Sequence, residues 1–173
     1  MKGGDMQKKV LTEQALYYGD VSMPKGFEIN HEQLKSEILE SLIKNEKTIF
    51  NKSLDSLNTY IKDFFNVKHK QSLVNKEAWG NVYTAKKTTE PLKEIDPVDL
   101  KNSADFVLLY GVQVKDCFIK IYYDDNRRKG RSWDIELKNN MFIMFPTNNM
   151  YIISNKHKDN SLNFIQTITY EYI

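Results

Sequence analysis

The sequence predicts an α+β fold in which two helices precede a jelly roll of short strands and pack on one of its sheets. Apolar residues follow helical spacing only up to residue 65, and after residue 73 they alternate or form short runs. Turn residues separate these runs into about six or seven strands, which is typical of a sandwich or barrel. A chain of 173 residues is expected to form one domain, residues 27–173, after an N-terminal arm of residues 1–26.

The segment 139–153 is expected to lie at the centre of this fold. It contains the longest apolar run, from Met141 to Phe145, which Pro146 ends. A run of about five apolar residues has the length of a strand rather than of a helix. Because almost every residue in it is apolar, both faces of this strand should be covered.

Two segments, 30–43 and 53–65, have the apolar spacing of amphipathic helices. Asn30 can cap the first helix, with Gln33 three residues later as in a capping box. The predicted apolar stripe of the first helix is Leu34, Ile38, Leu39, Leu42 and Ile43. The predicted stripe of the second is Leu54, Leu57, Ile61, Phe64 and Phe65.

The remaining strands are expected at 77–85, 105–114, 117–123, 132–137 and 162–172, with a loose strand around 15–18 in the arm. Alternation predicts two apolar strand faces, one formed by Cys117, Ile119, Ile121 and Tyr123 and the other by Leu162, Phe164, Ile168, Tyr170 and Tyr172. Residues 88–103 form a long loop, and loops of this length in compact domains are often functional.

Composition excludes several classes of function. A net charge of +2 gives little bulk attraction to nucleic acid or membrane. No apolar run approaches the roughly 18 residues that span a membrane, and the basic start lacks the apolar segment of a signal peptide. We therefore expect a cytoplasmic protein. The single cysteine, Cys117, is expected to be a small buried apolar residue. Phosphate-binding Gly-rich loops and the common hydrolase and zinc motifs are absent from the sequence.

Three motifs carry a resemblance to a known family. WGNVY at 79–83 resembles a WxNVY strand, DDNRR at 124–128 resembles a DPR segment, and NNMFIMFPT at 139–147 resembles a GxLVLFPS strand and turn. In order and spacing they resemble small phage and bacterial proteins of the 2-oxoglutarate/Fe(II) oxygenase superfamily, especially its uncharacterised members from marine tailed phages. The resemblance covers about residues 28–173 and implies a double-stranded β-helix, the jelly roll that the strand pattern also predicts.

The resemblance also implies where an iron site would lie. Such enzymes hold Fe(II) with two imidazoles and a carboxylate, in a His-x-Asp/Glu motif followed by a later His. A still later Arg or Lys binds the far carboxylate of 2-oxoglutarate. By this alignment the later His corresponds to Tyr151, the early motif to the segment from Glu94 to Asp96, and the Arg to the region 160–163, where no Arg occurs. The standard iron site and the cofactors Fe(II) and 2-oxoglutarate are therefore not expected, and no catalytic residue is assigned.

The three histidines do not restore the motif. His31 is expected on the surface of the first helix, and His69 lies between two lysines, whose charge disfavours a metal ion. His157 and Asp159 form a His-x-Asp pair, but on a polar turn with no histidine after it. The weak metal candidates are Glu94, Asp96 and His69.

Two further sets of residues are candidates for binding. We assign a candidate pocket to Tyr83, Glu94, Asp96, Tyr110, Tyr151 and Gln166. The densest cationic patch comprises Arg127, Arg128, Lys129 and Arg131. The patch is either a solvated hairpin turn or a contact for phosphate or for a partner's carboxylates.

Two main hypotheses for the function follow. The first is a non-catalytic relative that keeps the roll and acts as a phage-encoded binding or structural module, in the host cytoplasm or the virion. Its expected partner is another protein or a second copy of itself, rather than a membrane or nucleic acid. The alternative is an active 2-oxoglutarate- and Fe(II)-dependent dioxygenase that builds an atypical site from Glu94, Asp96 and a distant His. A weaker third hypothesis is nucleic-acid or carboxylate binding through Arg127, Arg128 and Arg131.

Overall fold

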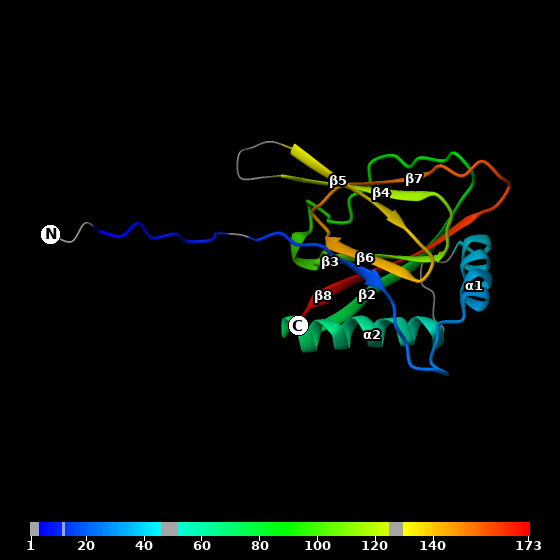
Figure 1. Cartoon of the computed structure of the whole chain (residues 1–173), viewed down its shortest axis with the longest axis horizontal. Helices are drawn as coiled ribbons and strands as arrows, with labels where there is room; N and C mark the ends of the chain where they lie inside the picture. Colours follow the sequence, from blue (N-terminus) through cyan, green and yellow to red (C-terminus); the bar gives the residue numbers. More distant parts are fainter. Residues whose placement is uncertain (1–3, 12, 46–51, 125–129) are drawn as a thin grey trace.

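The computed structural model describes residues 4–11, 13–45, 52–124 and 130–173. Two antiparallel sheets face each other, and two helices cover the outer face of the larger one (Figure 1). The larger sheet has the order β1-β6-β3-β8-β2, and the smaller has the order β5-β4-β7. After β3 the chain passes repeatedly between the two sheets, with β4, β5 and β7 in the smaller sheet and β6 and β8 in the larger one, so the architecture is a jelly roll with helices before it. The predicted fold class is therefore confirmed.

The strand bounds agree with the sequence pattern to within a few residues. In the larger sheet the strands are β1 (Tyr17–Asp20), β2 (Leu73–Tyr83), β3 (Phe106–Gln113), β6 (Met141–Pro146) and β8 (Asn163–Tyr172). In the smaller sheet they are β4 (Cys117–Asp124), β5 (Gly130–Leu137) and β7 (Tyr151–Asn155). The long loop contains the short 3-10 helix η1 (Leu100–Asn102), and it approaches β7 through two isolated bridges.

The prediction for the central segment is confirmed. Strand β6 lies between β1 and β3, and residues 141–145 are all buried. Phe142 and Met144 point toward the helices, whereas Met141, Ile143 and Phe145 join the apolar cluster between the two sheets. We call the space that this second cluster fills the roll interior.

Helix α1 (His31–Ile43) begins as the sequence predicts. The Asn30 side chain accepts a hydrogen bond from the Gln33 backbone N–H at 3.0 Å. The Asn30 N–H donates to the Ser53 hydroxyl at 3.0 Å, which ties the starts of the two helices together. Helix α2 (Lys52–His69) buries Leu54, Leu57, Ile61 and Phe65, with Phe64 partly buried, so its predicted stripe is confirmed.

The predicted stripe of α1 is partly wrong. Leu34 and Ile38 are fully buried, but Leu39, Leu42 and Ile43 are 40%, 46% and 85% exposed. The reason is the close approach of α1 to β2, where a Cβ atom at Gly80 would overlap the Ile38 side chain. A helix that lies this close to a strand touches it along a narrow line.

Three predicted strand-face residues also lie outside the core. Tyr123 is 37% exposed, because β7 pairs with β4 only from Cys117 to Ile121. Leu162 and Tyr172 are 36% and 45% exposed, just before the start of β8 and at its end. Within the described residues, no helix is long and apolar enough to cross a membrane.

Candidate functional site

Tyr151 and Glu94 meet inside the roll. Tyr151 begins β7 and exchanges two backbone hydrogen bonds with Leu92, at 2.8 and 2.9 Å. This bridge places Glu94, two residues further along the loop, beside the tyrosine ring. The Tyr151 hydroxyl donates a hydrogen bond to Glu94 Oε1 at 2.6 Å. The ring is 2% exposed and packs edge-on against Phe145, with centroids 5.2 Å apart.

Burial keeps the phenol of this pair protonated. Desolvation raises the pKa of Tyr151 far above its ordinary value, and the charge and hydrogen bond of Glu94 raise it further. Tyr83, at the end of β2, faces the same space, and burial raises the pKa of Tyr83 to about 12, with contributions from Cys117 and Glu94. The group is thus two neutral phenols around one carboxylate.

Two of the predicted pocket residues lie on the opposite face of the larger sheet. Tyr110 belongs to the helix-side cluster, where its hydroxyl donates to Asn140 Oδ1 at 2.7 Å and contacts His31 Nε2 at 2.6 Å. Gln166 is the cross-strand neighbour of Tyr110, and its Nε2 donates to the Trp79 carbonyl at 3.0 Å. His31 was expected on the surface, and its contact with Tyr110 half-buries it.

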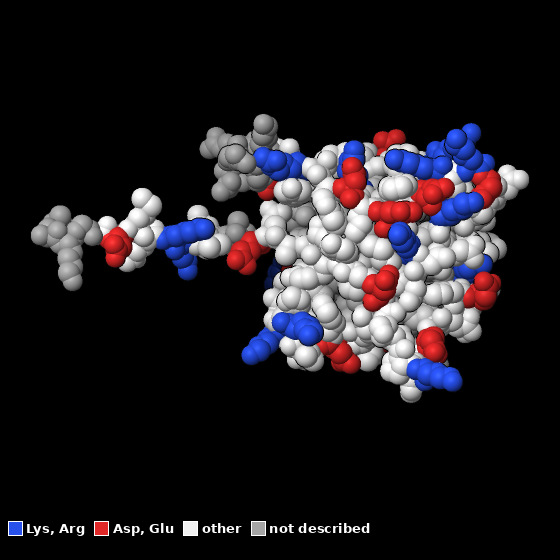
Figure 2. Space-filling view, in the orientation of Figure 1, with Lys and Arg blue, Asp and Glu red and all other residues white. Residues whose placement is uncertain are grey.

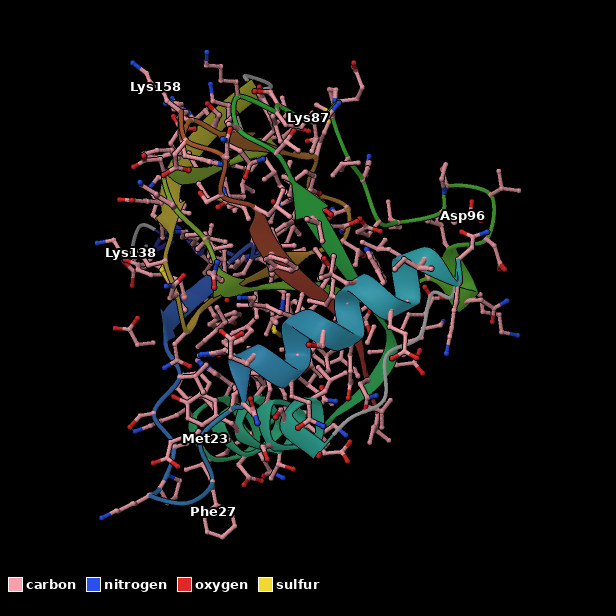
Figure 3. All side chains as sticks on the ribbon, turned by 90° about the vertical axis from the view of Figure 1, so that its right-hand side faces the viewer. Met23, Phe27, Lys87, Asp96, Lys138 and Lys158 are labelled. Atoms are coloured by element: carbon pink, nitrogen blue, oxygen red, sulfur yellow. The ribbon has the colours of Figure 1, made fainter. Side chains whose placement is uncertain are left out.

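Asp96 is exposed on the loop that projects at the right of Figure 3. Its Oδ1 accepts a hydrogen bond from the Val98 N–H at 2.9 Å, as in an Asx turn. The structure therefore divides the six predicted pocket residues among three locations. It brings together only Tyr83, Glu94 and Tyr151.

The residues at the implied iron positions do not fit Fe(II). The resemblance requires imidazoles and a carboxylate, and the chain offers a protonated phenol already bonded to the Glu94 carboxylate. Among the described residues no three His, Cys, Asp or Glu side chains are grouped so as to hold a metal ion. His69, the third weak metal candidate, ends α2 and packs among aromatic rings. Its ring centroid lies 4.8 Å from that of Tyr17 and 5.2 Å from that of Phe65.

The region expected to hold the co-substrate Arg contains a neutral amide with protein partners. Asn163, 1% exposed, contacts Asn155 Oδ1 at 2.7 Å and the Lys115 carbonyl at 3.1 Å through its Nδ2. Its Oδ1 accepts from the Lys115 N–H at 2.9 Å. His157 is fully buried and accepts from the Asn163 amide at 3.3 Å, while its Nε2 donates to the Ser161 carbonyl at 2.8 Å. The side chain of Asn163 therefore has neither the charge nor a free polar atom for a ligand carboxylate.

The His-x-Asp pair of the sequence is divided between two environments. His157 faces the buried amides, whereas Asp159 is exposed and pairs with Lys115 at 2.6 Å. Hydrogen bonds from Lys115 and Ser161 hold the pKa of Asp159 well below its ordinary range. Sequence reasoning missed the buried role of His157, because the surrounding residues are polar.

Most of the predicted cationic patch, Arg127, Arg128 and Lys129, lies outside the described residues. Arg131 is exposed on β5, opposite Tyr123 of β4. It lines a cavity of about 350 Å³ together with Lys93 and Met150.

Two adjoining cavities, missed by the sequence analysis, follow strand β2. They have volumes of about 390 and 210 Å³ and share Glu77, Trp79 and Glu94 in their lining. We call them together the β2 groove. The larger cavity also touches Leu42 and Asn45 near the C-terminal end of α1, and the smaller touches Asp96 and Asp99 of the loop.

Comparison with solved structures agrees with this architecture. A prolyl-4-hydroxylase from Pseudomonas putida superposes with a TM-score of 0.63 at 7% identity, covering 91% of this chain and 88% of that chain. A prolyl hydroxylase from Trichoplax adhaerens, solved with a peptide fragment of hypoxia inducible factor, has a TM-score of 0.61 at 7% identity, with coverages of 90% and 83%. The non-heme α-ketoglutarate-dependent carbocyclase SnoK of nogalamycin biosynthesis has a TM-score of 0.63 at 9% identity, with coverages of 91% and 79%.

The sequence itself matches no family model. No curated protein is significantly similar to it. At identities of 7–9% the structural likeness establishes the fold. The protein thus has the double-stranded β-helix fold of the 2-oxoglutarate/Fe(II) oxygenases.

Proposed function

We propose that this protein is a non-catalytic relative of the 2-oxoglutarate/Fe(II) oxygenases, in which the roll serves as a binding or structural module. The observation that carries the proposal is the hydrogen bond from Tyr151 to Glu94. The resemblance assigns both residues to positions of iron ligands, and the pair uses the carboxylate that a metal would need. Following the resemblance, we assign the module to a phage-infected host cytoplasm or a virion.

Energetics favour the pair over a metal at this place. A metal that takes Glu94 Oε1 would displace the buried Tyr151 hydroxyl from its acceptor, and an unsatisfied buried hydroxyl costs about 1–3 kcal/mol. In return the metal would gain a single carboxylate, because the phenol remains neutral at ordinary pH. A polypeptide is the expected partner, since a net charge of +2 gives little attraction to phosphate or to a membrane.

Thermal unfolding under anaerobic conditions, with Fe(II) and 2-oxoglutarate, tests this proposal. A ligand present at 100 times its Kd stabilises the folded state by about 2.7 kcal/mol, which for a chain of this size raises Tm by roughly 5–10 °C. We expect no such shift for the wild-type protein or for Glu94→Gln. A shift in the wild type that Glu94→Gln removes would instead support the alternative, an active dioxygenase with atypical ligands.

A further inference from the structure

Strand β2 has an open edge. It is 11 residues long and lies at one end of the larger sheet, where it pairs with β8 on one side only. In the part of the chain that the structure describes, no backbone hydrogen bond or bridge joins the other edge of β2 to a further segment. Long open edges are where an additional strand can pair, and this is a common mode of peptide recognition.

The groove along this edge is acidic with an apolar wall. Its lining includes the carboxylates of Glu77, Glu94, Asp96 and Asp99. The one described lysine of the lining, Lys76, lies 3.7 Å from the Glu171 carboxylate outside the groove and donates to the Asn102 carbonyl. Trp79 and Leu42 supply apolar surface. An extended segment that carries lysines between apolar residues would complement such a groove.

The chain itself contains a segment of this chemistry. Residues 4–11, which we call the N-terminal extension, are extended and exposed, and they project away from the body (Figure 1). The extension carries Lys8 and Lys9, and its cationic side chains stand clear of the body (Figure 2). Met6 and Leu11 are 99% and 90% exposed. Because these apolar side chains are almost fully exposed, covering them with a partner surface would remove much apolar area from water and stabilise the contact.

We propose that the extension of one copy of this protein pairs with the open edge of β2 in a second copy. In a strand, alternation places Met6, Lys8 and Val10 on one face and Gln7, Lys9 and Leu11 on the other. Either face therefore offers one lysine to the carboxylates beside an apolar side chain. The extension precedes β1, at the opposite end of the same sheet from β2, so the contact joins two different surfaces and either closes as a reciprocal dimer or ring or continues as a filament.

Association of the 173-residue protein tests this proposal, by analytical ultracentrifugation over a range of concentrations at low salt. We expect the wild type to self-associate, and salt to weaken the association because exposed charges are screened. The variants Lys8→Glu/Lys9→Glu and Glu77→Lys/Asp99→Lys should each associate at least about tenfold more weakly, since like charges then face each other. Exposed Lys138 and Lys158 provide a matched control, and Lys138→Glu/Lys158→Glu should associate like the wild type.

Mixing the two charge-reversed variants gives the decisive result. The acidic extension of one variant then faces the groove lysines of the other, so the mixture should associate more tightly than either variant alone. A wild type that remains a monomer would overturn the proposal, even if a free Lys-rich peptide bound the groove. A mixture that stays monomeric, although circular dichroism shows that both variants are folded, would also overturn the proposal. The outcome does not depend on iron binding, so failure here and failure of the proposed function are distinguishable.

Discussion

The Tyr151 hydroxyl lies 2.6 Å from Glu94 Oε1, and this bond joins the first residue of β7 to the loop that follows β2. Both residues occupy positions at which the resemblance implies iron ligands. The backbone bridge between Tyr151 and Leu92 fixes their approach, so the contact follows from the fold. The Tyr151 hydroxyl therefore occupies one oxygen of the carboxylate that the resemblance assigns to a metal ligand.

Tyr151→Phe should lower the free energy of unfolding by about 1–2 kcal/mol. Hydrogen bonds to charged groups contribute about 1.5–3 kcal/mol, and the partial exposure of Glu94 places the loss at the lower end. Urea denaturation measures the change, and the m-value should stay constant. Tyr123→Phe, at an exposed ring, is the control and should change stability by less than about 0.5 kcal/mol. Equal effects of the two substitutions would show that the Tyr151–Glu94 bond contributes nothing.

Asn163→Asp should destabilise the protein by about 3 kcal/mol or more. The new carboxylate would face the Lys115 carbonyl and Asn155 Oδ1, both acceptors that now receive the Asn163 amide. The Lys115 N–H would remain its donor, but a buried charge that also faces two acceptors is among the costliest substitutions. Chemical denaturation near neutral pH provides the measurement, with exposed Lys158→Ala as the control. A loss below about 1 kcal/mol would contradict the role assigned to this amide.

His31 should make stability depend on pH. Burial lowers the pKa of His31 below its ordinary value of 6.5, with the charge of Glu32 opposing the shift. Between the folded and unfolded pKa values the unfolded state binds more protons, so the free energy of unfolding falls as pH drops below about 6.5. Urea denaturation at several pH values between 7.5 and about 5 would measure this. His31→Gln should reduce the slope in this window, and an unchanged slope would show that another group causes it.

Gly80→Ala should cost about 1–3 kcal/mol, because its Cβ would overlap Ile38 of α1. Combining it with Ile38→Ala should cost less than the sum of the two single changes, since the smaller side chain makes room. Gly19→Ala is the matched control, as a Cβ there meets only the Phe142 ring at an ordinary 3.8 Å. Strictly additive losses in the double variant would argue against this close packing.

Local patterns were sufficient to predict most of the elements. Helix α2 and strand β6 carry their apolar residues at the spacing that their burial requires, and Asn30 marks the start of α1. The stripe of α1 was misjudged because the width of a helix contact depends on the partner surface. Gly80 narrows that surface, and no pattern within α1 reveals this.

The candidate site was only partly predictable. Alignment of motifs identified Glu94 and Tyr151, but not that they bond to each other, because a loop and a strand 57 residues apart meet only in the fold. Tyr110 and Gln166 were assigned to the same pocket, although they face the helices. Strand alternation shows which residues share a face of the sheet. It does not show which face is covered by the helices and which faces the second sheet. His157 gave no signal of burial, since it lies in a polar turn and its partners are the Ser161 carbonyl and the Asn163 side chain at the start of β8.

Anaerobic calorimetric titration of Fe(II) into the wild-type protein, with and without 2-oxoglutarate, tests the central claim most directly. If the Tyr151–Glu94 pair has replaced the iron site, neither titration will give binding heat that saturates at one equivalent. Binding with a Kd near or below about 1 µM, about −8 kcal/mol, would contradict the account. The contradiction would be complete if 2-oxoglutarate tightened that binding and Glu94→Gln abolished it.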